Sequence, residues 1–245
     1  RMSERGPGYW DALSEGDPDA AVLDPADRRG FKNRYIAMVR DRAIADSLSR
    51  LGRRAALLDF GCGSGSTSPL LERFADRVVG IDISRGLLHR AVRRPGLSRT
   101  AFVHYDGHRM PLAQAAFDAV VIYVVLSYVD DDTARRLLAQ LHAVTRPGGS
   151  LVMIEQTVRR PRVVEQGLKH LRHLDAWRGL LAHAGWRLDG TRQVRFGRFP
   201  TTPLIRAGAV PVSAFPALCS LEDALGRRMG PLPHDYAETL FEATA

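Results

Sequence analysis

Residues 57–66 read Leu-Leu-Asp-Phe-Gly-Cys-Gly-Ser-Gly-Ser, an apolar run that ends in an acid and continues into three closely spaced glycines. The apolar run predicts a buried strand. Glycines at positions 61, 63 and 65 allow the backbone to turn sharply and to approach a ligand without an intervening Cβ atom. A helix that begins near Ser66 directs its free N–H groups toward the same place. The stretch therefore predicts a nucleotide-type binding loop between a strand and a helix.

Strand-like apolar runs alternate with helical patterns around this loop. The predicted strands are residues 55–60, 77–83, 100–105, 117–123, 150–156, 186–194 and 236–245, and the predicted helices are 67–75, 87–93, 132–145 and 172–184. Alternation of this kind is typical of βα units around a parallel sheet. We therefore predict an α/β fold with a doubly wound, mostly parallel sheet.

Two further segments flank the predicted sheet. Apolar residues recur at helical spacing between residues 31 and 51, and Asp24-Pro25 predicts a helix start ahead of them. Residues 1–51 are therefore expected to form a helical N-terminal cover, and residues 52–245 the core. Within the core, residues 195–235 are rich in proline, with one predicted helix at 217–228. A segment of this length outside the regular alternation of strands and helices predicts an insertion or lid.

Composition narrows the class of protein. The net charge is +8, but 33 of the 35 basic residues are arginines scattered along the chain, so we disfavour nucleic-acid binding. The longest apolar stretch, residues 119–129, is about half of the roughly 20 residues that a membrane helix needs. The two cysteines have no metal-ligand spacing and are too few for a disulfide framework. We expect a soluble cytoplasmic protein without a metal site.

The glycine loop lacks one element of a dinucleotide site. Gly-x-Gly-x-x-Gly requires a third glycine at position 66, where this chain has serine. The stretch 59–65, Asp-Phe-Gly-Cys-Gly-Ser-Gly, instead resembles the first motif of class I S-adenosylmethionine-dependent methyltransferases. The later motifs follow in the family's order: Gly80-Ile81-Asp82-Ile83, His104-Tyr105-Asp106-Gly107, Phe117-Asp118-Ala119-Val120-Val121 and Arg146-Pro147-Gly148-Gly149. The resemblance, which covers residues 57–156, implies a Rossmann-like sheet with an antiparallel closing strand and S-adenosylmethionine as cofactor.

The same resemblance implies the cofactor contacts. Asp82 ends the second strand, where a carboxylate can accept from both ribose hydroxyls. In the family, the position of Asp106 accepts from the adenine amino group, and the backbone of Tyr123 borders the methionine end. The predicted cofactor-binding residues are Asp59, Gly61, Gly63, Asp82, Ile83, Asp106, Gly107 and Tyr123.

A second resemblance concerns the methyl acceptor. Residues 24–36 and 235–241 are similar to segments of methyltransferases of bacterial glycan and polysaccharide synthesis, which implies a sugar or other small-molecule hydroxyl as acceptor. Lys32 and its neighbour Asn33 are predicted to bind the substrate, because a lysine in so arginine-rich a chain suggests a need for a compact ammonium group. His170 is the third predicted substrate residue.

Transfer to a hydroxyl needs a general base near the ends of strands four and five. Glu155 lies near the end of the fifth strand, and His173 follows it, three residues after His170 and so on the same face of a helix. We predict Glu155 and His173 as catalytic residues. N- or C-methylation of a specialised metabolite is the first alternative, and a non-catalytic, cofactor-binding regulator is the second. The acceptor and the oligomeric state stay open.

Overall fold

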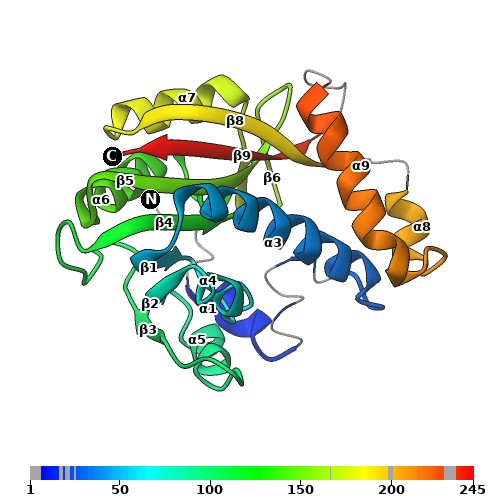
Figure 1. Ribbon diagram of the computed structural model, residues 1–245, viewed down its shortest axis with the longest axis horizontal. Helices are drawn as coiled ribbons and strands as arrows, with labels where there is room; N and C mark the ends of the chain where they lie inside the picture. Colours follow the sequence, from blue (N-terminus) through cyan, green and yellow to red (C-terminus); the bar gives the residue numbers. More distant parts are fainter. Residues whose placement is uncertain are drawn as a thin grey trace.

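The computed structural model describes residues 7–16, 19, 23–24, 26–165, 167–197, 201–228 and 236–245. A seven-stranded sheet runs through it in the order β3-β2-β1-β4-β5-β9-β8 (Figure 1). Strand β9 is antiparallel to both of its neighbours, whereas the pairs on the other side of β5 are parallel. The strands are β1 (Arg54–Phe60), β2 (Ala75–Asp82), β3 (Thr100–His104), β4 (Phe117–Tyr123), β5 (Thr145–Thr157), β8 (Arg187–Phe196) and β9 (Ala237–Thr244). The predicted fold class, including the antiparallel closing strand, is confirmed.

The residues of strand β4 show that this sheet is buried on both faces. Ala119 and Val121 pack into the apolar cluster on one face, and Val120 and Ile122 pack into the cluster on the other. Successive side chains of a strand point to opposite faces, so a strand covered on both sides reads as one continuous apolar run. Each side of the sheet consequently needs a layer of helices.

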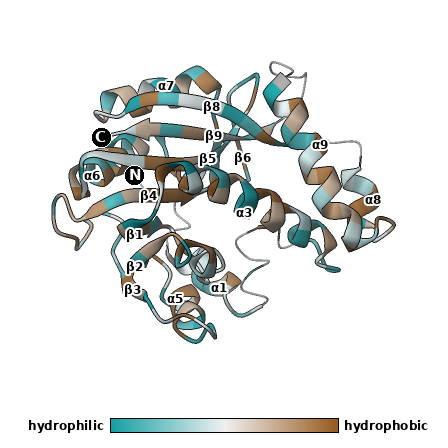
Figure 2. Cartoon of the chain, in the orientation of Figure 1, coloured by the Kyte–Doolittle hydropathy of each residue, from teal (hydrophilic) through white to brown (hydrophobic). Residues whose placement is uncertain are grey.

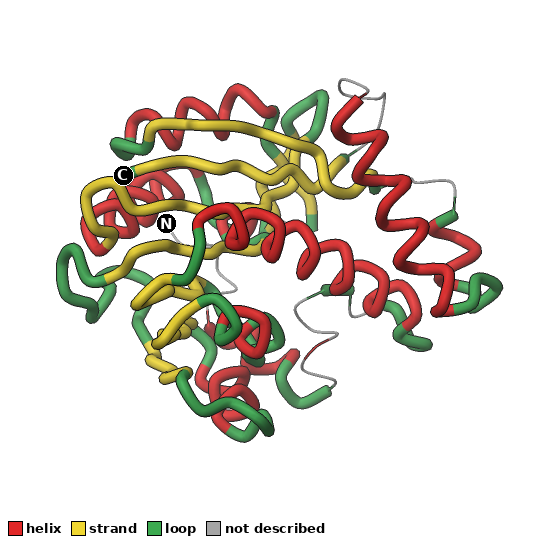
Figure 3. The backbone as a smooth tube through the Cα atoms, viewed as in Figure 1, coloured by secondary structure: helices red, strands yellow, loops and turns green. Residues whose placement is uncertain are grey.

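Those layers are visible in the tube drawing, where helices lie on both sides of the strands (Figure 3). On one side, α6 (Asp131–Val144) and α7 (Leu174–His183) cover the sheet. On the other side lies α3 (Phe31–Leu51). The short α4 (Ser68–Leu71) follows the glycine loop, and α5 (Arg85–Val92) packs on β3 and on α1 (Pro7–Leu13). This arrangement leaves the carboxyl ends of β1, β2 and β4 free to build a site.

The predicted N-terminal cover and the proline-rich insertion pack against each other. Helices α8 (Thr202–Arg206) and α9 (Phe215–Arg228) lie against α3, and the colouring of α3 and α9 alternates between polar and apolar residues (Figure 2). The rings of Tyr35 and Phe215 are 5.4 Å apart, and the Tyr35 hydroxyl donates to Glu222 at 2.7 Å. The described parts of residues 195–235 thus share one layer with α3, and Arg195 and Phe196 belong to β8.

Three local predictions differ from the structure. The helix predicted at 67–75 ends at Leu71, because Ala75 already pairs with β1. Asp24 does not start a helix: it accepts the Ala26 N–H in a turn, and α3 begins only after Gly30. Pro25 lies outside the described residues. The helix predicted at 172–184 begins only at Leu174, and the residues before it form an unpredicted hairpin of β6 (Arg162–Val164) and β7 (Lys169–Leu171), whose three-residue strands are too short to show a clear period. None of the described helices is long and apolar enough to cross a bilayer.

Candidate cofactor and acceptor site

The glycine loop leaves β1 in a conformation that suits glycine. Gly61, Gly63 and Gly65 have φ values of 69°, 53° and 71°, in the left-handed region that residues with a Cβ rarely adopt. A Cβ atom on Gly61 would lie 2.3 Å from Cγ2 of Val125, on the loop after β4. Glycine is therefore needed here both for the turn and for the close approach of the two loops.

Asp82 ties the loop to the end of β2. Its Oδ2 accepts the Gly63 N–H at 2.8 Å, and its Oδ1 accepts the Ser84 N–H at 2.8 Å. Burial raises the pKa of Asp82, while these backbone N–H groups oppose the rise. Each carboxylate oxygen has a second lone pair, so the group retains acceptor capacity for a ligand.

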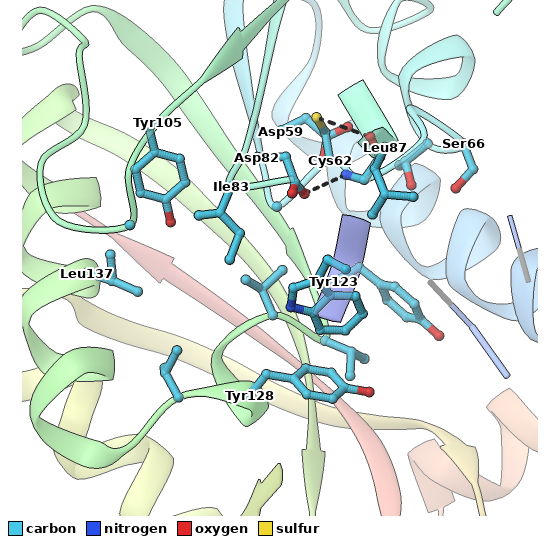
Figure 4. A pocket seen from close by; sticks show the side chains of 18 of the residues that line it. Asp59, Cys62, Ser66, Asp82, Ile83, Leu87, Tyr105, Tyr123, Tyr128 and Leu137 are labelled. Atoms are coloured by element: carbon cyan, nitrogen blue, oxygen red, sulfur yellow. Dashed lines mark hydrogen bonds between the residues drawn. The ribbon is translucent and has the colours of Figure 1, made fainter. Parts of the chain in front are cut away.

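A cavity of about 120 Å³ lies between these loops (Figure 4). Seven of the eight predicted cofactor-binding residues line it: Asp59, Gly61, Gly63, Asp82, Ile83, Gly107 and Tyr123. The eighth, Asp106, lies outside the lining, and its exposed carboxylate accepts the N–H groups of His108 and Arg109 in its own loop. Leu87, Tyr105 and Leu137 complete an apolar wall near Ile83.

A buried acid and a buried cation face this cavity together. Burial raises the pKa of Asp59 to about 7, against the lowering effect of the Arg40 guanidinium. Arg40 is only 2% exposed, donates from Nη1 to Ser66 at 3.0 Å and lies over the ring of Tyr123, 5.4 Å from its centroid. A ligand with both a positive and a negative group would find a partner for each here.

A second cavity of about 630 Å³ adjoins the first. Five residues line both cavities: Trp10, Tyr123, Val124, Tyr128 and Leu168. Figure 4 shows the hydroxyls of Tyr123 and Tyr128 pointing to the same side, away from Asp82. The rings of Trp10 and Tyr128 meet edge to face at 4.9 Å. A ligand in one cavity would therefore lie against the same side chains as a ligand in the other.

Both lysines of the chain line the second cavity. Lys32 pairs with Asp24 at 2.5 Å, and Lys169 lies 5.0 Å from the centroid of the Tyr128 ring. Lys32, which is predicted to bind the substrate, thus lies in the wall of a cavity. Its neighbour Asn33 does not line the cavity: its backbone N–H donates to Asp27 and its side-chain amide donates to the Asp24 carbonyl, so it holds the preceding loop.

Glu155 is a structural carboxylate. It is fully buried, and it accepts hydrogen bonds from the backbone N–H groups of Val125, Leu126 and Ser127 and from the Ser127 hydroxyl. It lines neither cavity. The prediction of a catalytic base at this position is therefore wrong, because the side chain points into the turn after β4 and not toward an acceptor.

The two histidines lie outside both cavities as well. On β7, Lys169 and Leu171 face the second cavity, so His170 between them points to the other side of the hairpin. His173 caps the start of α7, where its side chain accepts the Asp175 N–H. The two residues do not share a helical face, since one lies in a strand and the other precedes the helix. Their predicted roles in substrate binding and catalysis are thus not supported by their positions.

Several lining residues escaped the sequence analysis. Arg40 had a signal, because it interrupts the apolar face of α3 between Val39 and Ala43. Lys169 had one too, since the argument from rare lysines applies to it as well as to Lys32. Trp10 and Arg195 had none, because only the packing of α1 and β8 brings them to the site.

Comparison with known proteins agrees with this geometry. A family model described as a methyltransferase domain matches residues 57–149. The demethylmenaquinone methyltransferase of Thermobifida fusca is 37% identical over 147 residues, which are 56% of this chain and 60% of that protein. A SAM-dependent methyltransferase from Leishmania major superposes with a TM-score of 0.69 at 14% identity, over 97% of this chain and 82% of that one. The [4+2]-cyclase SpnF superposes with a TM-score of 0.59 at 24% identity, over 83% and 80%.

The chain thus matches a methyltransferase domain over residues 57–149 and shares its fold with an S-adenosylmethionine-dependent methyltransferase. It spans less than two thirds of the length of the T. fusca relative. The first cavity fits S-adenosylmethionine in its chemistry. Asp82 offers acceptors for ribose hydroxyls, the wall around Ile83 and Leu137 suits a purine, and Asp59 with Arg40 matches an amino acid's two charges.

Proposed function

We propose that the protein transfers a methyl group from S-adenosylmethionine to a hydroxylated small molecule with a planar ring, bound in the second cavity. The observation that carries this proposal is the shared wall of the two cavities, formed by Trp10, Tyr123, Val124, Tyr128 and Leu168. A reaction between two ligands requires their reacting atoms to meet at such a boundary. Aromatic side chains there offer flat faces for an acceptor ring.

The residues at the boundary position ligands and exclude water. S-adenosylmethionine supplies an electrophilic methyl group on a sulfonium. Burial raises the pKa of Tyr123 and, although Lys169 lowers it, also that of Tyr128, so both phenols stay protonated at neutral pH. The Tyr123 hydroxyl donates to Glu238 at 3.2 Å. These two side chains therefore orient an acceptor and do not abstract its proton, which goes to bulk solvent when the methyl group is transferred and S-adenosylhomocysteine forms.

The T. fusca relative supports a ring as acceptor, because its name places its own substrate among the quinones. In this chain the acceptor atom is either a carbon or an oxygen of a hydroxylated ring, and the product distinguishes them. A sugar hydroxyl, predicted from residues 24–36, is the second candidate. The polar side chains of Asp24, Lys32 and Gln156 in the same cavity favour it.

The test has two stages. First, calorimetry compares S-adenosylmethionine with NAD, and we expect only the former to bind. Second, S-adenosylmethionine carrying a ¹³C-methyl group is incubated with panels of hydroxylated aromatic compounds and of sugars, and the products are read by NMR, where O-methyl and C-methyl carbons differ in shift. Methylation of aromatic members supports the proposal, and methylation of sugars alone supports the second candidate. Binding without transfer to either panel would favour a non-catalytic protein.

A further inference from the structure

Three cations from distant parts of the chain meet in the second cavity. Lys32 comes from α3, Lys169 from the β6–β7 hairpin and Arg195 from β8. The two lysines are the only ones among 35 basic residues. Lysine is a compact point charge, whereas arginine is a planar fork, so the choice of residue matters for the ligand. The cavity therefore holds a selected set of hydrogen-bond donors.

The carboxylates of this cavity are already engaged. Asp24 accepts from Lys32 with Oδ2 and from the Ala26 N–H with Oδ1. Glu238 accepts from Arg195 with Oε1 and from Tyr123 with Oε2. Both oxygens of each group thus have a donor.

The third carboxylate, that of Glu165, is about half exposed, and its Oε1 lies 3.8 Å from Nζ of Lys169. That separation is longer than a hydrogen bond. Burial lowers the pKa of Lys169, but the Tyr128 hydroxyl and the Glu165 carboxylate outweigh this effect, so the pKa is raised. Lys169 therefore stays charged at neutral pH.

The cations, in contrast, have unused donors. An ammonium group carries three N–H bonds and a guanidinium five. Nη1 of Arg195 donates to Glu238 at 2.6 Å, while its buried Nη2 has no hydrogen-bond partner within the described part of the chain. Arg195 is 2% exposed and its Nη2 is buried, so the guanidinium acts on a ligand in the cavity through its positive charge and not through a hydrogen bond from Nη2. A ligand in this cavity can use the remaining N–H donors of the two lysines only if it brings acceptor oxygens.

We infer that the acceptor carries a carboxylate or a comparable oxyanion, which binds to Lys169 and Lys32 and is also attracted by the positive charge of Arg195. This inference rests on the proposed function, since it names the class of the substrate. The anionic group positions the ring, and the two phenols at the boundary complete its orientation.

Matched probes test the inference. The affinity of 3,4-dihydroxybenzoate and 1-hydroxy-2-naphthoate for the full chain with S-adenosylhomocysteine is measured by calorimetry and compared with that of the corresponding primary amides. The acids should bind about tenfold more tightly, as expected for a charge-assisted hydrogen bond. Equal affinity of acid and amide, or no binding of the acids at millimolar concentration, would overturn the inference.

Two variants locate the effect. Lys169→Met and Lys32→Met should each reduce the ratio of acid to amide affinity severalfold. Arg187→Gln is the control. It removes one positive charge at the start of β8, where Arg187 pairs with Thr244 of β9 and Thr244 pairs with Ser150 of β5, at the end of the sheet away from the cavities. This variant should leave the ratio of acid to amide affinity unchanged. An unchanged ratio in both lysine variants contradicts the inference. If the acids bind but are not methylated, the proposed function is overturned and the anion subsite is not. If methyl transfer occurs with a preference for the amides, the anion subsite is overturned and the proposed function is not.

Discussion

Asp82 and Gly63, 19 residues apart in the chain, are joined by a hydrogen bond of 2.8 Å from the Gly63 N–H to Oδ2 of Asp82. This bond makes one carboxylate responsible for both the shape of the glycine loop and the acceptor side of the first cavity. The backbone of the loop and the end of β2 are thereby held in one arrangement before a ligand arrives. Such preorganisation reduces the free energy that binding must spend on ordering.

Asp82→Ala should therefore weaken binding of S-adenosylmethionine by about a hundredfold, equivalent to the loss of two charge-assisted hydrogen bonds. Calorimetry on the purified variant measures the effect. Asp76→Ala, which removes an exposed acid paired with Arg53 from the start of β2, serves as the control and should bind as the parent does. An Asp82→Ala variant with unchanged affinity would show that the carboxylate does not contact the cofactor.

Asp59 should make cofactor binding depend on pH. Burial raises its pKa to about 7, so it is largely protonated below that pH and ionised above it. A ligand with positive groups binds better to the ionised form, so affinity for S-adenosylmethionine should increase as pH rises from 6 to 8, and binding near pH 6 should release a proton. The amino group of the ligand titrates in the same range, so the comparison is with Asp59→Asn. That variant should lose the part of the pH dependence that comes from the protein. If the parent and Asp59→Asn show the same dependence of affinity on pH, Asp59 does not cause it.

Glu155 should matter for stability and not as a base. Glu155→Gln replaces one carboxylate oxygen by an N–H₂ group, which faces either the N–H groups of Val125 and Leu126 or the donors of Ser127, so buried donors lose their acceptor. We expect the free energy of unfolding to fall by about 2–4 kcal/mol. Denaturant unfolding measures this, with Glu242→Gln, on the exposed pair with Arg50, as the matched control. A folded Glu155→Gln variant of unchanged stability that has lost all turnover would restore the catalytic interpretation.

Trp10 should report ligand binding by its fluorescence. It lines both cavities and lies against Tyr128, whereas Trp177 and Trp186 are 0% and 2% exposed in the core. Binding of S-adenosylmethionine should change the emission of the protein, and Trp10→Phe should remove most of that change while the variant still binds by calorimetry. A full signal in Trp10→Phe would mean that α1 does not cover the cofactor.

The fold was predictable because its signals are local. A strand buried on both faces reads as an apolar run, as residues 117–123 do, and a strand-to-helix turn at a ligand needs glycine, as at 61 and 63. The order of such elements limits the topology to a few arrangements. Asp59 and Asp82 could be predicted for the same reason, since each lies at the end of a strand next to that turn. The short hairpin 162–171 was not, because three-residue strands carry too little pattern to separate them from a helix start.

Side-chain direction was the main source of error at the site. Glu155 follows four buried apolar residues of β5 and lies at the expected end of the sheet, but it points into the turn after β4, where three N–H groups need an acceptor. His170 is one position away from the residues that line the cavity, because Lys169 and Leu171 lie on the face of β7 that is turned toward it. A strand reverses its facing at each residue, so an error of one position exchanges inside for outside.

The sequence alone determined the sheet, the glycine loop and the class of cofactor, since all three depend on residues that are close together along the chain or end successive strands. Only the tertiary structure decided the second cavity as a whole, of whose lining the sequence had predicted Lys32 as a substrate residue. Trp10, Lys32, Lys169 and Arg195 belong to four elements separated by long stretches of chain, and only the packing of α1, α3, the hairpin and β8 around the carboxyl end of β4 brings them to one cavity. Contacts between such distant residues leave no periodic pattern, because each depends on the shape of the whole fold.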